Sequence, residues 1–151
     1  MPFQPFHEIF PEIAAIEIRA VTILKENDIV PKGSYGFVEM FCNDKNCNCK
    51  RVIFNVLDEI GNSMALIGFG WGDKKHYDKW MRRKITESMF KELIGPCHYD
   101  GQRPSQHADF FLDFFKNTLL NDIKYIERVK RHYLMFKNYI DHGLKNKSKF
   151  N

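Results

Sequence analysis

The chain lacks any apolar run near the roughly 20 residues that a membrane-spanning helix needs. Its first six residues, MPFQPF, have neither the basic region nor the apolar region of a secretory signal. We therefore expect a cytosolic protein without a membrane segment. The sequence also contains no internal repeat, no low-complexity segment and no long linker. At 151 residues, with 44% apolar and 28% charged residues, it fits one folded domain over residues 1–151.

Known catalytic signatures are missing as well. We find no hydrolase nucleophile elbow, no H-E-x-x-H, no kinase signature and no zinc deaminase pattern of the form H-x-E…P-C-x-x-C. The sequence thus shows no assembled nucleophile, base and oxyanion site. Whether the protein is an enzyme stays open at this stage.

Cysteine is scarce, with four in the whole chain, but three of them lie within eight residues as C-N-D-K-N-C-N-C. Disulfides are rare in the cytosol, which favours metal binding or free thiols for Cys42, Cys47 and Cys49. The Asn and Asp residues between them allow a tight loop that turns the sulfurs inward, each about 2.3 Å from a shared zinc. The alternative, three reduced thiols buried as small apolar groups, fits the polar neighbours poorly. We therefore expect zinc, although the spacing lacks the C-x2-C pairs of zinc fingers.

A structural zinc takes four ligands, so the fourth must come from outside the cysteine loop. The candidates are Cys97, His98 and His132. The first two occupy a predicted loop, where only one of two adjacent side chains can face the metal. His132 belongs to the last predicted helix, where a lone histidine is more often packed or exposed than bound to metal. Asp44 is a less favoured ligand in a thiolate site.

The front half of the chain reads as strands and the back half as helices. Alternation and β-branched residues predict strands, with a helix over residues 12–20 as the alternative for the first of them. Three- and four-residue apolar spacing predicts the helices, with Asp73, Ser105 and Asn121 or Asp122 as N-caps and Gly143 as the last C-cap. The predicted strands cover residues 16–24, 35–41, 52–57 and 64–71, and the predicted helices cover residues 74–83, 85–94, about 106–119 and about 123–142.

Strands followed by helices indicate an α+β domain. We expect an antiparallel meander of about four strands with the C-terminal helices covering one face. Gly95-Pro96 should end the second helix, because proline bars continuation.

The net charge of +4 is spread unevenly. Residues 122–151 hold eight Lys or Arg against three Asp or Glu, a net of +5, so the rest of the chain carries −1. Positive charge is densest in the tail over residues 145–149, and the simplest interpretation of this tail is a solvated terminus. A basic C-terminal helix also makes nucleic acid a candidate partner, beside protein.

Two further patterns have a plain structural interpretation. The glycines of Gly68-Phe69-Gly70-Trp71-Gly72 lie between a strand and a helix, but the spacing is not that of a phosphate loop. The negative charge of Asp73 would also repel a phosphate at the start of the helix. The favoured interpretation is therefore that the glycines allow close packing of the backbone. Charges inside predicted strands would need partners if buried, and Glu39 is a candidate partner for Arg19. A solvent-facing row of charges, which includes Glu17, is the simpler alternative.

Three stretches resemble uncharacterised small microbial proteins that carry a C-x4-C-x-C loop and an R-H-Y segment in a C-terminal helix. They are YGFVEMFC over residues 35–42, CNCKRV over residues 47–52 and ERVKRHY over residues 127–133. This resemblance implies no established activity. The loop is also similar to SEC-C metal-binding modules, but no Cys-Cys or Cys-His pair follows its C-x-C, and no role is carried over.

The leading functional hypothesis is a module that interacts with protein or nucleic acid and has a structural zinc, which pins the cysteine loop to a later segment of the chain. One alternative is an enzyme whose zinc has three thiolate ligands and an open position for water. Another is a thiol redox sensor that releases its metal on oxidation.

Overall fold

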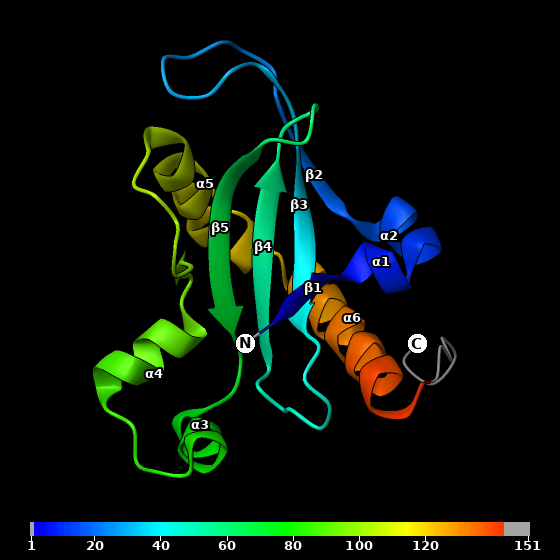
Figure 1. The fold of residues 1–151 in the computed structure, drawn as a ribbon. Coiled ribbons are helices and arrows are strands. Elements are labelled where there is room, and N and C mark those ends of the chain that lie inside the picture. Colours follow the sequence, from blue (N-terminus) through cyan, green and yellow to red (C-terminus); the bar gives the residue numbers. More distant parts are fainter. Residues whose placement is uncertain (1, 144–151) are drawn as a thin grey trace.

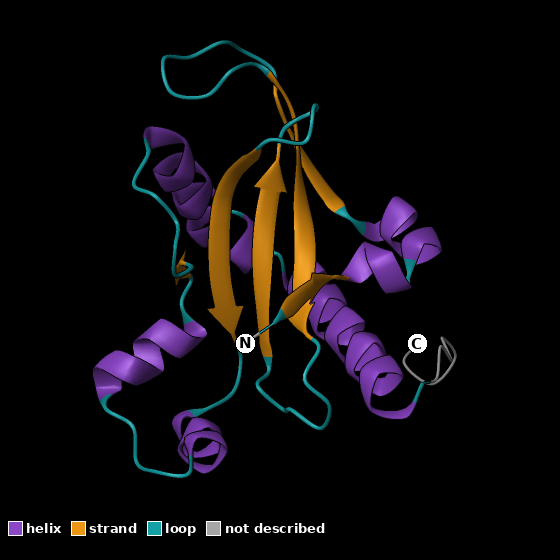
Figure 2. Cartoon of the chain, in the orientation of Figure 1, coloured by secondary structure: helices purple, strands orange, loops and turns teal. Residues whose placement is uncertain are grey.

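The structure is a computed structural model that describes residues 2–143, and it confirms an α+β fold. An antiparallel sheet stands in front of two long helices, α5 and α6 (Figures 1 and 2). The basic tail at residues 145–149 lies outside the described residues. The strands are β1 Phe3–Pro5, β2 Arg19–Ile23, β3 Gly33–Cys42, β4 Arg51–Leu57, β5 Ser63–Gly70 and β6 Cys97–His98.

The meander predicted from the sequence is β3-β4-β5, and each neighbouring pair is antiparallel. The sheet has six strands where we expected about four, because β1 and β2 both pair with β3 and the two-residue β6 pairs with β5. Strands as short as β1 and β6 carry too few residues for alternation to reveal them. Our two alternatives for residues 12–24 each hold in part, since a helix ends at Glu17 and β2 begins at Arg19.

The helices begin where capping side chains predict. Asp73, Ser105 and Asp122 each accept a hydrogen bond from a backbone N–H of the first turn. The first helix after the sheet ends earlier than expected, because Arg82 takes a left-handed conformation. Gly143 caps the last helix in the left-handed region, as predicted. The helices are α1 Phe6–Ile9, α2 Pro11–Glu17, α3 Lys74–Met81, α4 Glu87–Ile94, α5 Gln106–Asn117, the 3-10 turn η1 Leu119–Asn121 and α6 Ile123–His142.

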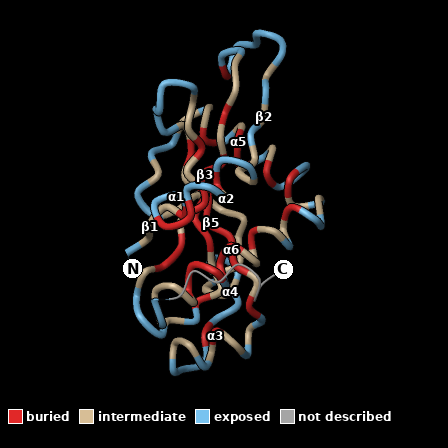
Figure 3. Tube along the Cα trace, turned by 90° about the vertical axis from the view of Figure 1, so that its right-hand side faces the viewer, coloured by how far each residue is buried: buried red, intermediate tan, exposed pale blue. Residues whose placement is uncertain are grey.

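Aromatic rings form most of the contact between the sheet and the two helices. Phe54 of β4 packs on Phe115 of α5 with ring centres 4.9 Å apart, and Phe41 of β3 packs on Phe136 of α6 at 5.6 Å. The predicted alternation in β3 is confirmed at Phe37 and Phe41, which are fully buried on this face. Figure 3 shows the buried stretches along β3, β5 and α6.

One polar network lies inside this interface. His132 of α6 is 1% exposed, and its two ring nitrogens lie 2.7 Å from Glu39 Oε1 and 2.9 Å from Glu17 Oε1. Arg131 Nη2 donates to the carboxylate of Glu17 at 2.6 Å, and Phe6 stacks on the imidazole with centres 4.3 Å apart. The network therefore joins β3, α6 and the N-terminal helices α1 and α2.

The structure corrects the expected partner of Arg19. Its guanidinium pairs with Asp122 at 3.0 Å, and Glu39 is bonded to His132 instead. Glu39 is 3% exposed, so the solvent-facing alternative does not hold for this residue. The side chain points to the helix-covered face, where a carboxylate without a partner would be costly.

The glycine-rich strand end is closely packed, as favoured from the sequence. A β-carbon at Gly70 would lie 2.6 Å from both the Leu93 carbonyl oxygen and Tyr77 Oη. Separately, none of the helices within residues 2–143 has the length and apolar character that crossing a membrane requires.

We expect the network around Glu17 to make stability depend on pH. Partial burial raises the pKa of Glu17, but hydrogen bonds from His132 and Arg131 outweigh this, and the pKa lies below its ordinary 4.5. With a lowered folded pKa, the stabilisation is complete above the unfolded value and is lost as the pH falls through the folded value. Glu17→Gln should lower the unfolding free energy by about 1–3 kcal/mol at pH 7.

Urea unfolding of metal-free, reduced protein over a pH series measures this difference. The gap between wild type and Glu17→Gln should close as the pH falls below 4.5. Glu26→Gln, at an exposed position, is the control and should show no gap at any pH. A gap of equal size in acid and at neutral pH would contradict the assignment.

Candidate metal centre

The three clustered cysteines converge in the folded chain. Cys42 is the last residue of β3, and Cys47 and Cys49 follow in the loop that leads to β4. Their sulfur atoms all lie within 4.8 Å of one another. Cys42 and Cys49 are fully buried, and Cys47 is half-buried. A tetrahedral zinc with bonds of about 2.3 Å holds its sulfurs about 3.8 Å apart, so a small rotation of these side chains suffices to bind one ion.

The loop owes its shape to local turn chemistry. Asn46 and Lys50 both have positive φ, at 63° and 48°, and asparagine tolerates this region better than most residues. The N–H of Cys47 donates to the Asp44 carbonyl at 3.2 Å, which closes a turn. The N–H of Asp44 points at Cys42 Sγ, 3.4 Å away. The turn thus directs a backbone donor and three sulfurs to one place.

Helix α6 holds the loop from one side. Tyr133, Lys137 and Asp141 are spaced four residues apart, so they lie along one face of the helix. Tyr133 Oη accepts from the N–H of Lys50 at 3.1 Å, and Asp141 Oδ1 accepts from the N–H of Asn46 at 2.7 Å. The loop is therefore fixed to a helix almost one hundred residues away by bonds that need no metal.

Lys137 is the middle member of this row and is 6% exposed. Its ammonium donates to the carbonyl oxygens of Cys42 at 3.1 Å and Asp44 at 2.6 Å. Among residues 2–143 it forms no ion pair with a carboxylate. A buried ammonium without a counter-charge is costly, so the sulfur cluster is the negative charge that it faces.

Helix α3 closes the other side. Tyr77 Oη donates to the Lys50 carbonyl at 3.2 Å, and His76 Nε2 lies 2.8 Å from the Asn48 carbonyl oxygen. The indole of Trp80 is hydrogen-bonded to Cys47. Sequence reasoning did not identify these three residues as neighbours of the thiols. It also missed Tyr133 and Lys137, since only a long-range contact identifies them.

The sulfurs differ in acidity. Hydrogen bonds from Cys49 and from the N–H of Asp44, together with the charge of Lys137, lower the pKa of Cys42 to about 6. The hydrogen bond to Cys42 and burial raise the pKa of Cys49, and burial raises that of Cys47. Without metal, one thiolate thus accepts bonds from two thiols at neutral pH. A bound cation replaces those protons.

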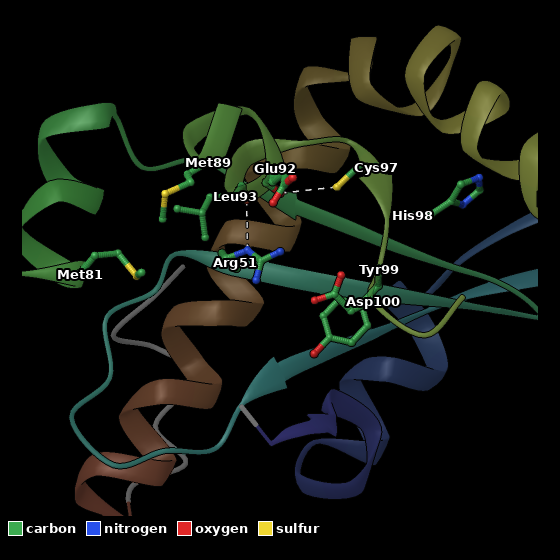
Figure 4. Close-up of a pocket in the computed structure, with 9 residues that line it drawn as sticks. All are labelled: Arg51, Met81, Met89, Glu92, Leu93, Cys97, His98, Tyr99 and Asp100. Atoms are coloured by element: carbon green, nitrogen blue, oxygen red, sulfur yellow. Dashed lines mark hydrogen bonds between the residues drawn. The ribbon is translucent and has the colours of Figure 1, made fainter. Parts of the chain in front are cut away.

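The structure does not bring the other candidate ligands to this cluster. Both ring nitrogens of His132 are bonded to carboxylates, so neither is free for a metal. Cys97 Sγ donates to the Glu92 carbonyl at 3.5 Å, and His98 Nε2 lies 2.8 Å from Asp109 Oδ1. Both residues line a separate cavity (Figure 4).

Within residues 2–143, no histidine, carboxylate or fourth cysteine joins the three thiols. Asp44 contributes its backbone and not its carboxylate. The donor set, three soft thiolates with no protein donor in a fourth position, still fits zinc.

No family model, curated protein or solved structure matches this chain. The resemblance to uncharacterised microbial proteins therefore stays a prediction, and any function must be argued from the site itself.

Substituting Cys97, His98 and His132 one at a time tests whether any of them is the fourth zinc ligand or only supports the fold. We expect Cys97→Ala and His98→Ala to leave zinc affinity unchanged, because these side chains are bonded elsewhere. His132→Phe should keep zinc but lower the unfolding free energy by about 3–5 kcal/mol, because Glu39 is left buried without its partner. His142→Phe, at an exposed position on the same helix, is the control.

Zinc affinity is measured by chelator competition, and stability by urea unfolding of the metal-free protein. Loss of zinc binding in one of these variants, with the fold intact, would restore that residue as the fourth ligand.

Proposed function

We propose that the chain is a zinc-binding interaction module in which Cys42, Cys47 and Cys49 hold the ion as thiolates. The fourth position is left to water or to a donor from a bound partner. The observation that carries this is the convergence of three sulfurs within 4.8 Å with no fourth cysteine, histidine or carboxylate donor among residues 2–143. The remaining residues, 1 and 144–151, include no cysteine, histidine, aspartate or glutamate.

Charge supports a divalent ion. Three thiolates carry −3, a zinc ion adds +2, and the buried ammonium of Lys137 adds +1, so the assembly is neutral. A monovalent soft cation such as Cu(I) would leave a net negative charge in a site where two of three sulfurs are fully buried. The protein thus supplies the compensating charge for a divalent thiolate complex.

The place of the ligands supports a local role for the ion. All three come from residues 42–49, so the ion closes a short loop and does not cross-link distant segments. The loop is already bonded to α3 and α6. Its exposed residues Asp44, Lys45, Asn46 and Asn48 stand at one end of the sheet. The ion therefore adds rigidity to a surface loop that is exposed to a partner.

The surroundings favour binding over catalysis. An open zinc position could activate water, but a hydrolytic site also uses a general base close to the metal. No histidine or carboxylate of residues 2–143 joins the sulfur cluster, and the neighbouring His76 is engaged through Nε2 with the Asn48 carbonyl oxygen. This supports an interaction module over the enzyme alternative.

A protein is the better supported partner. The positive charge of α6 made nucleic acid a candidate, but several of its cations are used inside the molecule. Arg128 donates to the Glu17 carbonyl, Arg131 pairs with the Glu17 carboxylate, and Lys137 is buried. Cations in such bonds are not free to contact phosphates.

Metal analysis tests the proposal directly. Protein purified without added metal should contain one zinc ion per chain by elemental analysis, and Cys47→Ser should lose it. Cys97→Ser is the matched control and should keep it. Removal of zinc should raise amide hydrogen exchange in residues 43–50 and leave the sheet protected, because the other bonds of the fold do not need the ion. Absence of zinc would refute the proposal, and global unfolding on its removal would assign the ion a structural role instead.

The role of Lys137 has its own test. Lys137→Gln keeps an N–H donor for the two carbonyls but removes the charge, and it should weaken zinc binding roughly tenfold to a hundredfold. Lys124→Gln, at an exposed position on the same helix, should bind zinc like wild type. Chelator competition measures both. Equal affinities for Lys137→Gln and wild type would show that the charge does not act on the ion.

A further inference from the structure

A second candidate site lies away from the thiols. A cavity of about 340 Å³ opens between the end of α3, helix α4, the start of β4 and the segment around β6. None of the three clustered cysteines lines it. Figure 4 shows Arg51 at its centre, with a hydrogen bond from Nε to the Leu93 carbonyl oxygen at 3.1 Å. The volume falls in the range of small-molecule sites.

The guanidinium of Arg51 is held in place but only partly used. Among residues 2–143, no hydrogen bond or ion pair engages Nη1 or Nη2. Two glycines make room for the side chain on the neighbouring strand. A β-carbon at Gly68 would lie 3.2 Å from Arg51 Nη2, and one at Gly70 would lie 3.1 Å from Arg51 Cγ. The half-buried guanidinium of Arg51 thus faces the cavity with two Nη donors in one plane. This geometry suits a carboxylate, which can accept a hydrogen bond from each of them.

The other walls are of two kinds. Figure 4 shows Met81, Met89 and Leu93 together on one side of Arg51, an apolar and adaptable surface. The carboxylates of Glu92 and Asp100 also line the cavity, and neither forms an ion pair with Arg51. Both carboxylates belong to exposed residues, and they border the same small space as the half-buried guanidinium.

We infer that this cavity binds a small zwitterion, namely a free α-amino acid with an apolar side chain. Its carboxylate would accept from the two Nη groups of Arg51, and its ammonium would face Glu92 and Asp100. The side chain would pack on Met81, Met89 and Leu93. A simple anion would meet two carboxylates, and a simple cation would meet the guanidinium. A ligand with both charges meets the guanidinium with its carboxylate and the two carboxylates with its ammonium, which is the better electrostatic match.

Calorimetric titration with L-methionine tests this inference. L-methionine methyl ester lacks the carboxylate, and N-acetyl-L-methionine lacks the ammonium. Each should bind roughly tenfold to a hundredfold more weakly than the free amino acid, because a charged hydrogen bond is lost. Arg51→Gln and the double variant Glu92→Gln/Asp100→Asn should lose affinity for L-methionine by a similar factor. Arg103→Gln, an exposed arginine outside the cavity, is the control.

Amino acids also bind zinc, so the titration is repeated on Cys47→Ser. That variant should keep L-methionine binding, since no thiol lines the cavity, and binding lost with the zinc would place the ligand on the metal and overturn the inference. Absence of binding to wild type would also overturn it, as would an affinity for the ester or for the acetylated probe equal to that for L-methionine. If Arg51→Gln does not fold, the double variant decides: unchanged affinity there refutes the role of the two carboxylates.

Discussion

Helix α6 is fixed to strand β3 by two buried polar contacts, and the rest of the molecule is arranged around them. His132 bonds Glu39 in the middle of the strand, and Lys137 bonds the Cys42 carbonyl at its end. Between them, aromatic contacts such as that of Phe41 with Phe136 bury the helix against the sheet. Polar groups inside an apolar interface must find their partners, so they allow only one register of the helix along the strand.

That register sets the position of the cysteine loop. With Lys137 at the end of β3, the next turn of α6 brings Asp141 to the N–H of Asn46. Tyr133, one turn earlier, reaches the N–H of Lys50. The loop is thus bonded at both of its ends and near its middle before any metal binds. Such a preformed site would spend little binding energy on ordering the chain.

One backbone residue separates the two candidate sites. Lys50 lies directly before β4 and has a φ of 48°, so the chain is not extended between Cys49 and Arg51. Cys49 belongs to the buried core, while Arg51 lines the cavity on the other side. The Cys49 thiol and the Arg51 guanidinium are therefore only two residues apart but lie in different sites, the sulfur cluster and the cavity. The proposed zinc site and the proposed zwitterion site therefore share no side chain.

Local sequence patterns were enough to predict the α+β class, the β3-β4-β5 meander, the helix caps at Asp73, Ser105 and Asp122, and the meeting of three cysteines. Each of these depends on neighbours in the chain, through strand and helix periodicity, cap chemistry or a tight loop. Only the tertiary structure decided the partners of Glu39, His132, Lys137 and Arg51. These side chains meet groups up to about a hundred residues away, and no local pattern encodes which faces of a helix and a sheet come together. The short strands β1 and β6 also depend on tertiary contacts. They are strands because they pair with the long strands β3 and β5, and their own sequences do not predict this.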